Sequence, residues 1–331
     1  MKAIRNFGIL KAIAFITTVF FLISCDPKDE PIPVVKTTKS SVRIGIAQDV
    51  KLSSAKLTAV VVPNEDNTSV AFEYQTTNST WSTKVLPTKF SGKDSIKVTF
   101  DLSDLQLNTV YSFRLRAINV AGDTVSTVST FKTYAVSDYD GNLYHTITIG
   151  TQTWLQENLK TTHFANGDVI PNVKDQAQWN KMITPAYCYY NNDEAIGKEY
   201  GALYNWYVVT DPRGLIKGLH TPTIDEFVKL RDFLGGEQVA AGKVKEAGFK
   251  HWLSPNTSAT NSSEFTALPG GVRQEIFSGL GTESMIWSST KQDMGFPTAY
   301  DNLIVHKSAI FYAGSGGNEY SSGLSARLVK D

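Results

Sequence analysis

The sequence predicts a multidomain protein in which an all-β sandwich, over residues 42–135, precedes a loop-rich α+β domain over residues 136–331. The length of 331 residues is about twice that of an ordinary domain. Apolar residues make up 41% of the chain and charged residues 19%, a composition that can bury a core. Short β-rich runs separated by turn residues fill the first region, whereas the second has few helical patterns and frequent glycine.

Charge and cysteine content argue against two classes of protein. The chain has 32 basic and 32 acidic residues, so its net charge at neutral pH is zero. Without an excess of positive charge it has no long-range attraction for a phosphate backbone, which argues against a nucleic-acid partner. The two cysteines are too few for a disulfide framework, so a small crosslinked scaffold is excluded.

The first 24 residues have the pattern of a secretory signal peptide. Residues 1–11 carry three basic side chains and no acidic one, and residues 12–23 are almost wholly apolar. As a helix this apolar run would rise about 18 Å, which is short of the ~30 Å hydrocarbon core of a bilayer. We therefore expect residues 1–24 to be removed rather than to span a membrane.

The signal ends in Leu22-Ile-Ser-Cys25, which resembles the lipobox of bacterial lipoproteins. The resemblance implies that Cys25 becomes the lipid-modified first residue, and two or three acyl chains hold a protein stably on a membrane. Residues 25–41 contain three prolines and many charges and are expected to form a flexible tether. We expect an outer-membrane lipoprotein displayed on the cell surface, with a periplasm-facing orientation as the alternative.

Alternating apolar and polar residues predict strands of the sandwich at residues 57–62, 70–74, 96–100 and 111–119. In the last of these, Tyr111, Phe113, Leu115 and Ala117 share one face, as expected for a strand that packs on a core on one side. Residues 105–122 resemble the later strands of a fibronectin type III domain. The resemblance implies that Tyr111 is a tyrosine-corner residue, whose hydroxyl bonds to backbone just upstream.

Two short segments resemble the acceptor motif for O-linked glycans in some Bacteroidota. They are Asp94-Ser95-Ile96 and Asp123-Thr124-Val125, so the resemblance implies Ser95 and Thr124 as acceptors. The alternative is that both segments are ordinary turn sequences, because the motif is only three residues long.

Turn and capping patterns predict local structure in the second domain. Asp140-Gly141 between two β-forming runs indicates a hairpin turn, whereas a calcium loop at this place would lack its required glycine and glutamate. Thr223 and Glu226 form a capping box, which predicts the start of an amphipathic helix that ends at two glycines. Shorter helices are expected at residues 175–179, 200–209 and 238–247.

Several blocks in this domain occur in the order found in the Fibrobacter succinogenes major paralogous domain. They are Trp154-Leu-Gln-Glu-Asn-Leu159, Tyr189–Asp193, Tyr200–Trp206, His220–Thr223 with Glu226, Phe265–Gly271 with Arg273, Trp287–Thr290 and Gly323–Asp331. The resemblance implies a C-type-lectin-like fold, which that family shares with formylglycine-generating enzymes, and a secreted or surface location. It implies no particular activity.

No motif in the domain assembles a catalytic, cofactor or metal site. The five histidines show no zinc-ligand spacing, and no phosphate-binding glycine loop or nucleophile elbow is present. Cys188 lies in an apolar aromatic run, where a cysteine usually acts as a small hydrophobic residue. The oxidase chemistry of formylglycine-generating enzymes uses two cysteines, and this domain has one. We therefore expect no enzyme, no cofactor and no metal.

The polar loops instead predict binding of an extracellular glycan or protein ligand. The candidate ligand-binding residues are Trp252, Asn256, Tyr190, Asn192 and Asp193. The segment 191–194 also has oxygen ligands for calcium, with a polar turn as the alternative. Two other functions stay open: a structural protein of envelope assembly without a soluble ligand, and a hydrolase whose carboxylate pair comes from Glu157, Asp193 and Glu226.

Overall fold

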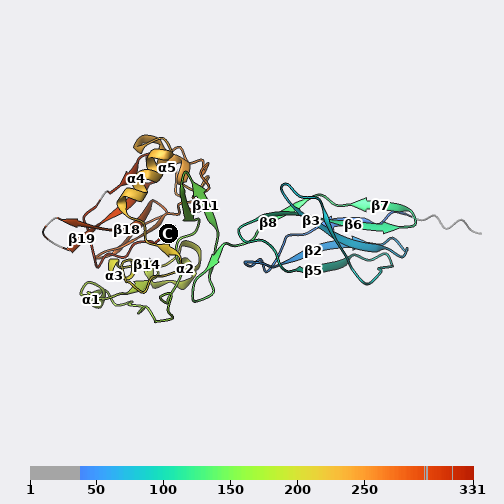
Figure 1. The fold of residues 1–331 in the computed structure, drawn as a ribbon, viewed down its shortest axis with the longest axis horizontal. Helices are drawn as coiled ribbons and strands as arrows, with labels where there is room; N and C mark the ends of the chain where they lie inside the picture. The colour runs from blue at the N-terminus through green and yellow to red at the C-terminus, as the bar shows by residue number, and fades with distance from the viewer. Residues whose placement is uncertain (1–37, 294, 296, 315) are drawn as a thin grey trace, which may run out of the picture. The chain divides into compact units, whose positions relative to one another are not determined.

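The computed structural model describes residues 38–331 except 294, 296 and 315 (Figure 1). The predicted signal peptide 1–24, the lipidation residue Cys25 and most of the tether 25–41 lie outside the described residues. The described chain is mostly β, as the sequence predicts. No helix in the described part is long and apolar enough to cross a membrane.

The first region folds as two antiparallel sheets, drawn as separate layers in Figure 1. One sheet has the order β1 (Ser41–Ile44), β2 (Ala55–Val62) and β5 (Ile96–Leu102). The other has the order β4 (Ser82–Val85), β3 (Ser69–Thr76), β6 (Val110–Asn119) and β7 (Gly122–Val125), with β8 (Ser129–Lys132) also paired to β6. The predicted sandwich is therefore confirmed.

The core of the sandwich lies between the faces that the alternation predicts. Tyr111, Phe113, Leu115 and Ala117 are all buried on β6. The Tyr111 hydroxyl accepts a hydrogen bond from the backbone N–H of Gln106 at 2.9 Å, which confirms the tyrosine corner. On the other face of the sheet, the Arg114 guanidinium lies 4.2 Å from the centroid of the Trp81 ring.

The two predicted glycan acceptors differ in accessibility. Ser95 is exposed in the loop before β5. The Thr124 hydroxyl on β7 is buried and has no hydrogen-bond partner in the described structure. A modifying enzyme needs to reach the acceptor oxygen, which is more accessible at Ser95 than at the half-buried Thr124, and both acceptors stay predictions.

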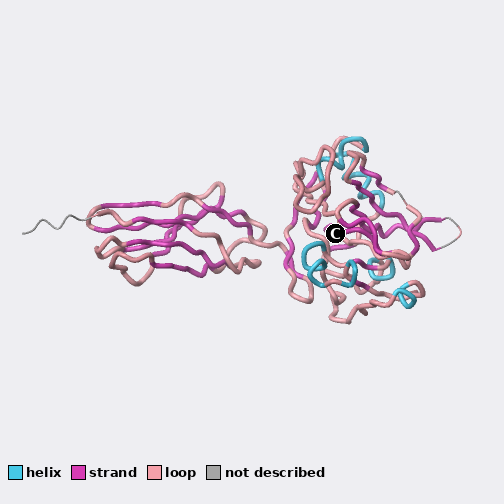
Figure 2. Tube along the Cα trace, turned by 180° about the vertical axis from the view of Figure 1, so that it is seen from behind, coloured by secondary structure: helices cyan, strands magenta, loops and turns pink. Residues whose placement is uncertain are grey.

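The C-terminal region consists of small sheets linked by long loops (Figure 2). The hairpin at Asp140-Gly141 is confirmed: β9 (Val136–Ser137) pairs with β10 (Leu143–Tyr144). One four-stranded sheet contains β11 (Thr146–Ile149), β12 (Gln152–Leu155), β22 (Val329–Lys330) and β15 (Leu219–His220). A second four-stranded sheet contains β18 (Glu283–Asp293), β19 (Pro297–Val305), β20 (Phe311–Ala313) and β21 (Asn318–Glu319). Two further two-stranded sheets pair β13 (Tyr187–Cys188) with β14 (Leu203–Tyr204), and β16 (Gly270–Arg273) with β17 (Phe277–Leu280); the second pair is a hairpin.

The helices are short. The capping box is present at the start of α4 (Ile224–Phe233), where the Thr223 hydroxyl accepts from the Glu226 N–H and the Glu226 carboxylate accepts from the Thr223 N–H. The remaining helical segments are α1 (Gln176–Trp179), η1 (Tyr190–Asn192), α2 (Glu194–Tyr200), α3 (Trp206–Val209) and α5 (Glu237–Val244). The predicted continuous helix 200–209 is wrong, because α2 ends at Tyr200, β14 follows at Leu203–Tyr204, and only the last turn, α3, is helical again.

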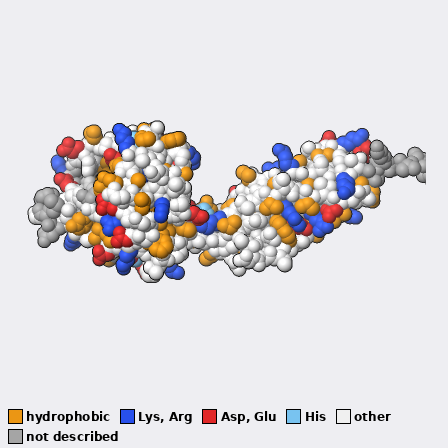
Figure 3. Space-filling model, turned by 90° about the horizontal axis from the view of Figure 1, so that it is seen from above, with side chains coloured by type: hydrophobic (Ala, Val, Ile, Leu, Met, Phe, Trp, Pro, Cys, Tyr) orange, Lys and Arg blue, Asp and Glu red, His pale blue; other side chains and the backbone are white. Residues whose placement is uncertain are grey.

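Three apolar clusters of described residues lie in this domain. The first contains Tyr204, Trp206 and Trp287, and the second lies under α4 and α5 and contains Trp154, Trp252 and Phe265. The third contains Trp179, Cys188 and Leu203. On the face shown in Figure 3, basic and acidic side chains are interspersed with uncharged and apolar ones.

Candidate functional site

Two of the predicted ligand-binding residues support the fold instead. Trp252 is fully buried in the cluster under α4 and α5, and its Nε1–H donates to the Ala267 carbonyl at 2.9 Å. Asn256 is 6% exposed, and its Nδ2 donates to the carbonyls of Glu246 and Gly248 at 3.0 and 2.7 Å. Neither side chain offers a surface to a ligand, so both predictions are wrong.

The other three predicted residues lie on one turn. Asp193 is the N-cap of α2, and its Oδ1 accepts from the Ala195 N–H at 2.8 Å. The Asn192 Nδ2 donates to the Lys174 carbonyl at 3.2 Å. The Tyr190 ring packs on Phe277 with 5.3 Å between centroids. Capping thus explains Asp193, whereas Tyr190 and Asn192 adjoin the segments that form a polar pocket.

This polar pocket has a volume of about 490 Å³ and is open to solvent. Its walls are residues from the turn and second strand of the β16–β17 hairpin and from the segment 317–322, and its floor follows α1. The lining residues are Trp179, Asn180, Gln274, Glu275, Ile276, Ser278, Gly317, Glu319, Ser321 and Ser322. Amide, hydroxyl and carboxylate groups therefore surround a space large enough for one or two sugar rings.

The β16–β17 hairpin is shaped by a close backbone approach. Gly271 has a φ of +68°, and a Cβ there would lie 2.5 Å from the Ser278 carbonyl oxygen and 2.7 Å from the Tyr190 ring. The hairpin places Gln274 at its turn, where the Gln274 Nε2 donates to the Asn318 Oδ1 at 2.9 Å. This hydrogen bond joins the two walls of the polar pocket.

Arg273 supports the floor of the pocket from inside the domain. Its guanidinium is fully buried and lies 4.4 Å from the centroid of the Trp179 ring. Nη1 and Nη2 donate to the carbonyls of Val173 and Lys174 at 2.6 and 2.9 Å, and Nε donates to the Gln176 Oε1 at 3.1 Å. Because the guanidinium donates to the carbonyls of Val173 and Lys174, Arg273 holds the segment before α1 in place.

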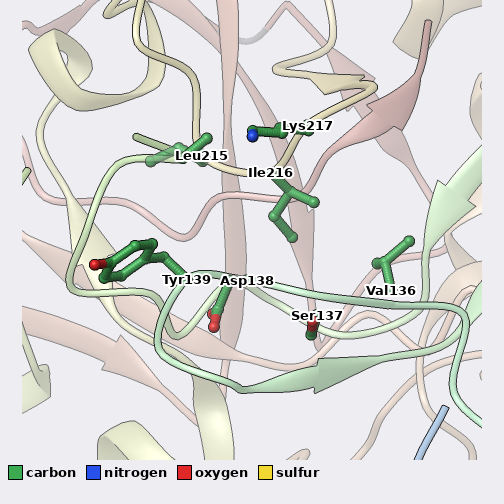
Figure 4. A pocket seen from close by; sticks show the side chains of 8 residues that line it. Val136, Ser137, Asp138, Tyr139, Leu215, Ile216 and Lys217 are labelled. Atoms are coloured by element: carbon green, nitrogen blue, oxygen red, sulfur yellow. The ribbon is translucent and has the colours of Figure 1, made fainter. Parts of the chain in front are cut away.

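A second pocket, of about 330 Å³, lies beside the β9–β10 turn (Figure 4). Tyr139, Asp138 and Lys217 line it, but their polar ends lie apart from one another in this view. The Asp138 carboxylate already accepts hydrogen bonds from Asn142 and from the Tyr144 hydroxyl, at 2.8 and 2.7 Å. This pocket presents fewer convergent polar groups than the polar pocket does.

A third pocket, of about 380 Å³, has mostly apolar walls and His220 at its side. The two imidazole nitrogens of His220 lie 2.7 Å from the Asp331 carboxylate and 3.0 Å from the Glu226 carboxylate. Burial opposes protonation, but these two hydrogen bonds outweigh it and raise the pKa of His220. An imidazolium fits this position, because only the protonated ring carries two N–H donors.

The raised pKa of His220 predicts a pH-dependent stability. A group whose pKa is higher in the folded state stabilises fully below its unfolded value, about 6.5, and the stabilisation is lost as the pH rises through the folded value. We therefore expect His220→Gln to destabilise at about pH 5.5, below the unfolded pKa, and to approach the parent as the pH rises through the raised pKa of the folded state. Urea unfolding across this range measures the difference, with His306→Gln, whose ring faces backbone carbonyls, as the control. A pH-independent difference would contradict the assignment.

The three carboxylates considered for hydrolysis form hydrogen bonds that support the fold, and the Cys188 thiol is buried. Glu157 accepts from the His145 N–H at 2.9 Å, Asp193 caps α2, and Glu226 belongs to the capping box. These three carboxylates lie on separate elements and do not line one pocket among those described. Burial raises the pKa of the Cys188 thiol to about 11, so this group is protonated at neutral pH.

Residues 147–330 match the family described as the Fibrobacter succinogenes major domain. The chain belongs to this family. The Fibrobacter succinogenes major domain therefore contains the polar pocket, from α1 to the segment 317–322. No curated protein matches the chain.

Two solved structures give partial likenesses. The sensor domain of the anti-sigma factor RsgI4 from Pseudobacteroides cellulosolvens is 22% identical, over 30% of this chain and 98% of that one, with a TM-score of 0.25. The fibronectin type III domain of human fibronectin type III domain containing protein 3 is 20% identical, over 32% of this chain and 96% of that one, with a TM-score of 0.24. At these TM-scores we draw no conclusion from either likeness.

None of the residues that line the polar pocket is predicted as a binding residue from the sequence. The only local signals are a polar turn at residues 274–275 between two strand-like runs and a stretch rich in glycine and serine at 314–323. Nothing in the spacing of these segments places them beside α1, which lies about a hundred residues earlier in the chain.

Proposed function

We propose that the Fibrobacter succinogenes major domain of this chain is a non-catalytic binding module whose polar pocket takes an extracellular glycan. The observation that carries the proposal is the convergence of amide, hydroxyl and carboxylate groups from two walls on a pocket of about 490 Å³. Sugars are bound by such sets of polar groups around a concave surface that also has apolar parts. Ile276, which is exposed, supplies an apolar part here, whereas the buried Trp179 ring packs beneath the floor.

A blocked pocket tests this proposal. Ser278 is exposed on β17 and lines the pocket, so Ser278→Trp should fill the space and lower the affinity for any bound oligosaccharide at least about tenfold. The matched control is Ser82→Trp, an exposed strand position in the sandwich. A glycan array identifies the ligand, and calorimetric titration then compares the affinities of the parent, Ser278→Trp and Ser82→Trp.

Equal affinity in all three proteins would contradict a site in this pocket. Absence of any glycan ligand would favour the alternative of a structural protein in envelope assembly.

We further propose that the protein is an outer-membrane lipoprotein anchored through Cys25 and displayed at the cell surface. The lipobox-like sequence and the proline-containing tether support this proposal. We also propose a C-type-lectin-like fold for the C-terminal domain, on the strength of the motif order in the sequence. Mass spectrometry of the protein from its native membrane should find a mature chain that starts at an acylated Cys25. An unprocessed Met1 would contradict the anchor.

A further inference from the structure

Only glutamates contribute charge to the lining of the polar pocket. Glu275 stands on the turn of the β16–β17 hairpin and Glu319 on β21, so each wall contributes one carboxylate. Both residues are exposed, and neither carboxylate forms an ion pair with a described basic residue. The Glu319 Oε2 accepts from the Ser321 hydroxyl at 3.3 Å, which leaves its other oxygen to a ligand.

The buried guanidinium of Arg273 lies close to the pocket but has no donor free to bind an anion there. The three donor nitrogens of Arg273 bond to the Val173 and Lys174 carbonyls and to Gln176, on the inner side of Trp179. The Gln274 amide nitrogen is bonded to Asn318. A ligand in the pocket therefore meets amide and hydroxyl groups that can donate or accept, and its only charged partners in the lining are two carboxylates, which accept.

We infer that the polar pocket prefers sugars that carry an ammonium group over sugars that carry a carboxylate. This inference rests on the proposed glycan binding and adds the chemical class of the ligand. An ammonium group donates up to three hydrogen bonds and is attracted by both glutamates, whereas a uronic acid would bring a third negative charge to the same pocket. Neutral N-acetylated sugars are expected to bind with intermediate affinity.

The size of the preference follows from the exposure of the two glutamates. Ion pairs at exposed sites are weak, so two of them should give a preference of roughly fivefold between an amino sugar and its neutral N-acetyl form at low ionic strength. Salt screens exposed pairs, and the preference should shrink as the ionic strength rises toward 1 M.

Calorimetric titration of the full chain with three oligosaccharides of equal length tests the inference. They are oligomers of glucosamine, N-acetylglucosamine and galacturonic acid, at about pH 6, where the amine is protonated and the uronic acid ionised. The test variant is Glu275→Gln with Glu319→Gln. The control removes two exposed carboxylates outside the pocket, Asp225→Asn with Glu237→Gln, in the first turns of α4 and α5.

The expected order of affinity is glucosamine, N-acetylglucosamine, galacturonic acid. The test variant should lose this order while it still binds the neutral oligomer, and the control variant should keep it. Equal affinities in the parent, or an unchanged preference in the test variant, would overturn the inference and leave the glycan-binding proposal standing. Absence of binding for all three oligomers, together with an empty glycan array, would overturn both.

Discussion

Trp252→Ala is expected to lower the free energy of unfolding of the C-terminal domain by about 3–5 kcal/mol, the range for removing a large buried aromatic side chain. Trp252 has no exposed surface, and its ring packs in the same apolar cluster as Trp154 and Phe265. The substitution also leaves the Ala267 carbonyl without its indole donor. Urea unfolding followed by circular dichroism measures the loss.

The same substitution separates a structural from a ligand-binding role. Trp252 does not line the polar pocket, so the folded variant should bind oligosaccharide with the affinity of the parent. Trp252→Phe is the graded control and should destabilise less, because it keeps most of the apolar volume. Unchanged stability combined with lost binding would show that the ring contacts the ligand after all.

Arg273→Met is expected to have the second large effect, a loss of about 3 kcal/mol of stability. A hydrogen bond from a charged donor contributes about 1.5–3 kcal/mol, and Arg273 donates to two backbone carbonyls. Removing a buried charge recovers part of this loss, because a guanidinium in the interior carries a desolvation cost. Chemical unfolding of the variant and the parent at neutral pH measures the difference.

Ligand affinity should fall together with stability in this variant. Arg273 stacks under Trp179 and fixes the segment before α1, so the floor of the polar pocket should become mobile when the guanidinium is absent. Arg273→Lys keeps the charge but not the planar set of donors, and it should restore only part of either property. Full rescue by lysine would show that charge alone, rather than the directed hydrogen bonds, holds the floor.

Much of the sandwich and the longest helix could be predicted from the sequence because local periodicity determines them. The alternation from Tyr111 to Ala117 matches the buried face of β6, and the capping box at Thr223 and Glu226 marks the start of α4. In both elements the side-chain pattern and the tertiary environment favour the same structure.

Predictions were wrong where tertiary contacts outweigh local pattern. Residues 200–209 have helical spacing of large apolar side chains, but Leu203 and Tyr204 pair with β13 and so form a strand. The sequence does not predict helix α2, because its residues are mostly polar and its N-cap, Asp193, stands in a run that also fits a turn or a calcium loop.

The candidate site was harder to predict than the fold. Trp252 precedes a polar loop, which favours an exposed ring, but neighbours in sequence do not determine burial, and the ring lies in the core. The polar pocket is formed by α1, the β16–β17 hairpin and the segment 317–322, which only the folded chain brings together. Tyr190 and Asn192 lie near the pocket in the folded chain. Tyr190 packs on Phe277 of β17, and Asn192 donates to the carbonyl of Lys174, which precedes α1.

The central claim is that ligand binds between the β16–β17 hairpin and the segment 317–322. Hydrogen–deuterium exchange of the full chain, with and without a saturating oligosaccharide, tests it most directly, because bound ligand slows exchange of the backbone amides that it covers. We predict slowed exchange at residues 274–280 and 317–322 and no change in the loop 253–263. Protection confined to the loop 253–263 or to the sandwich would contradict the claim.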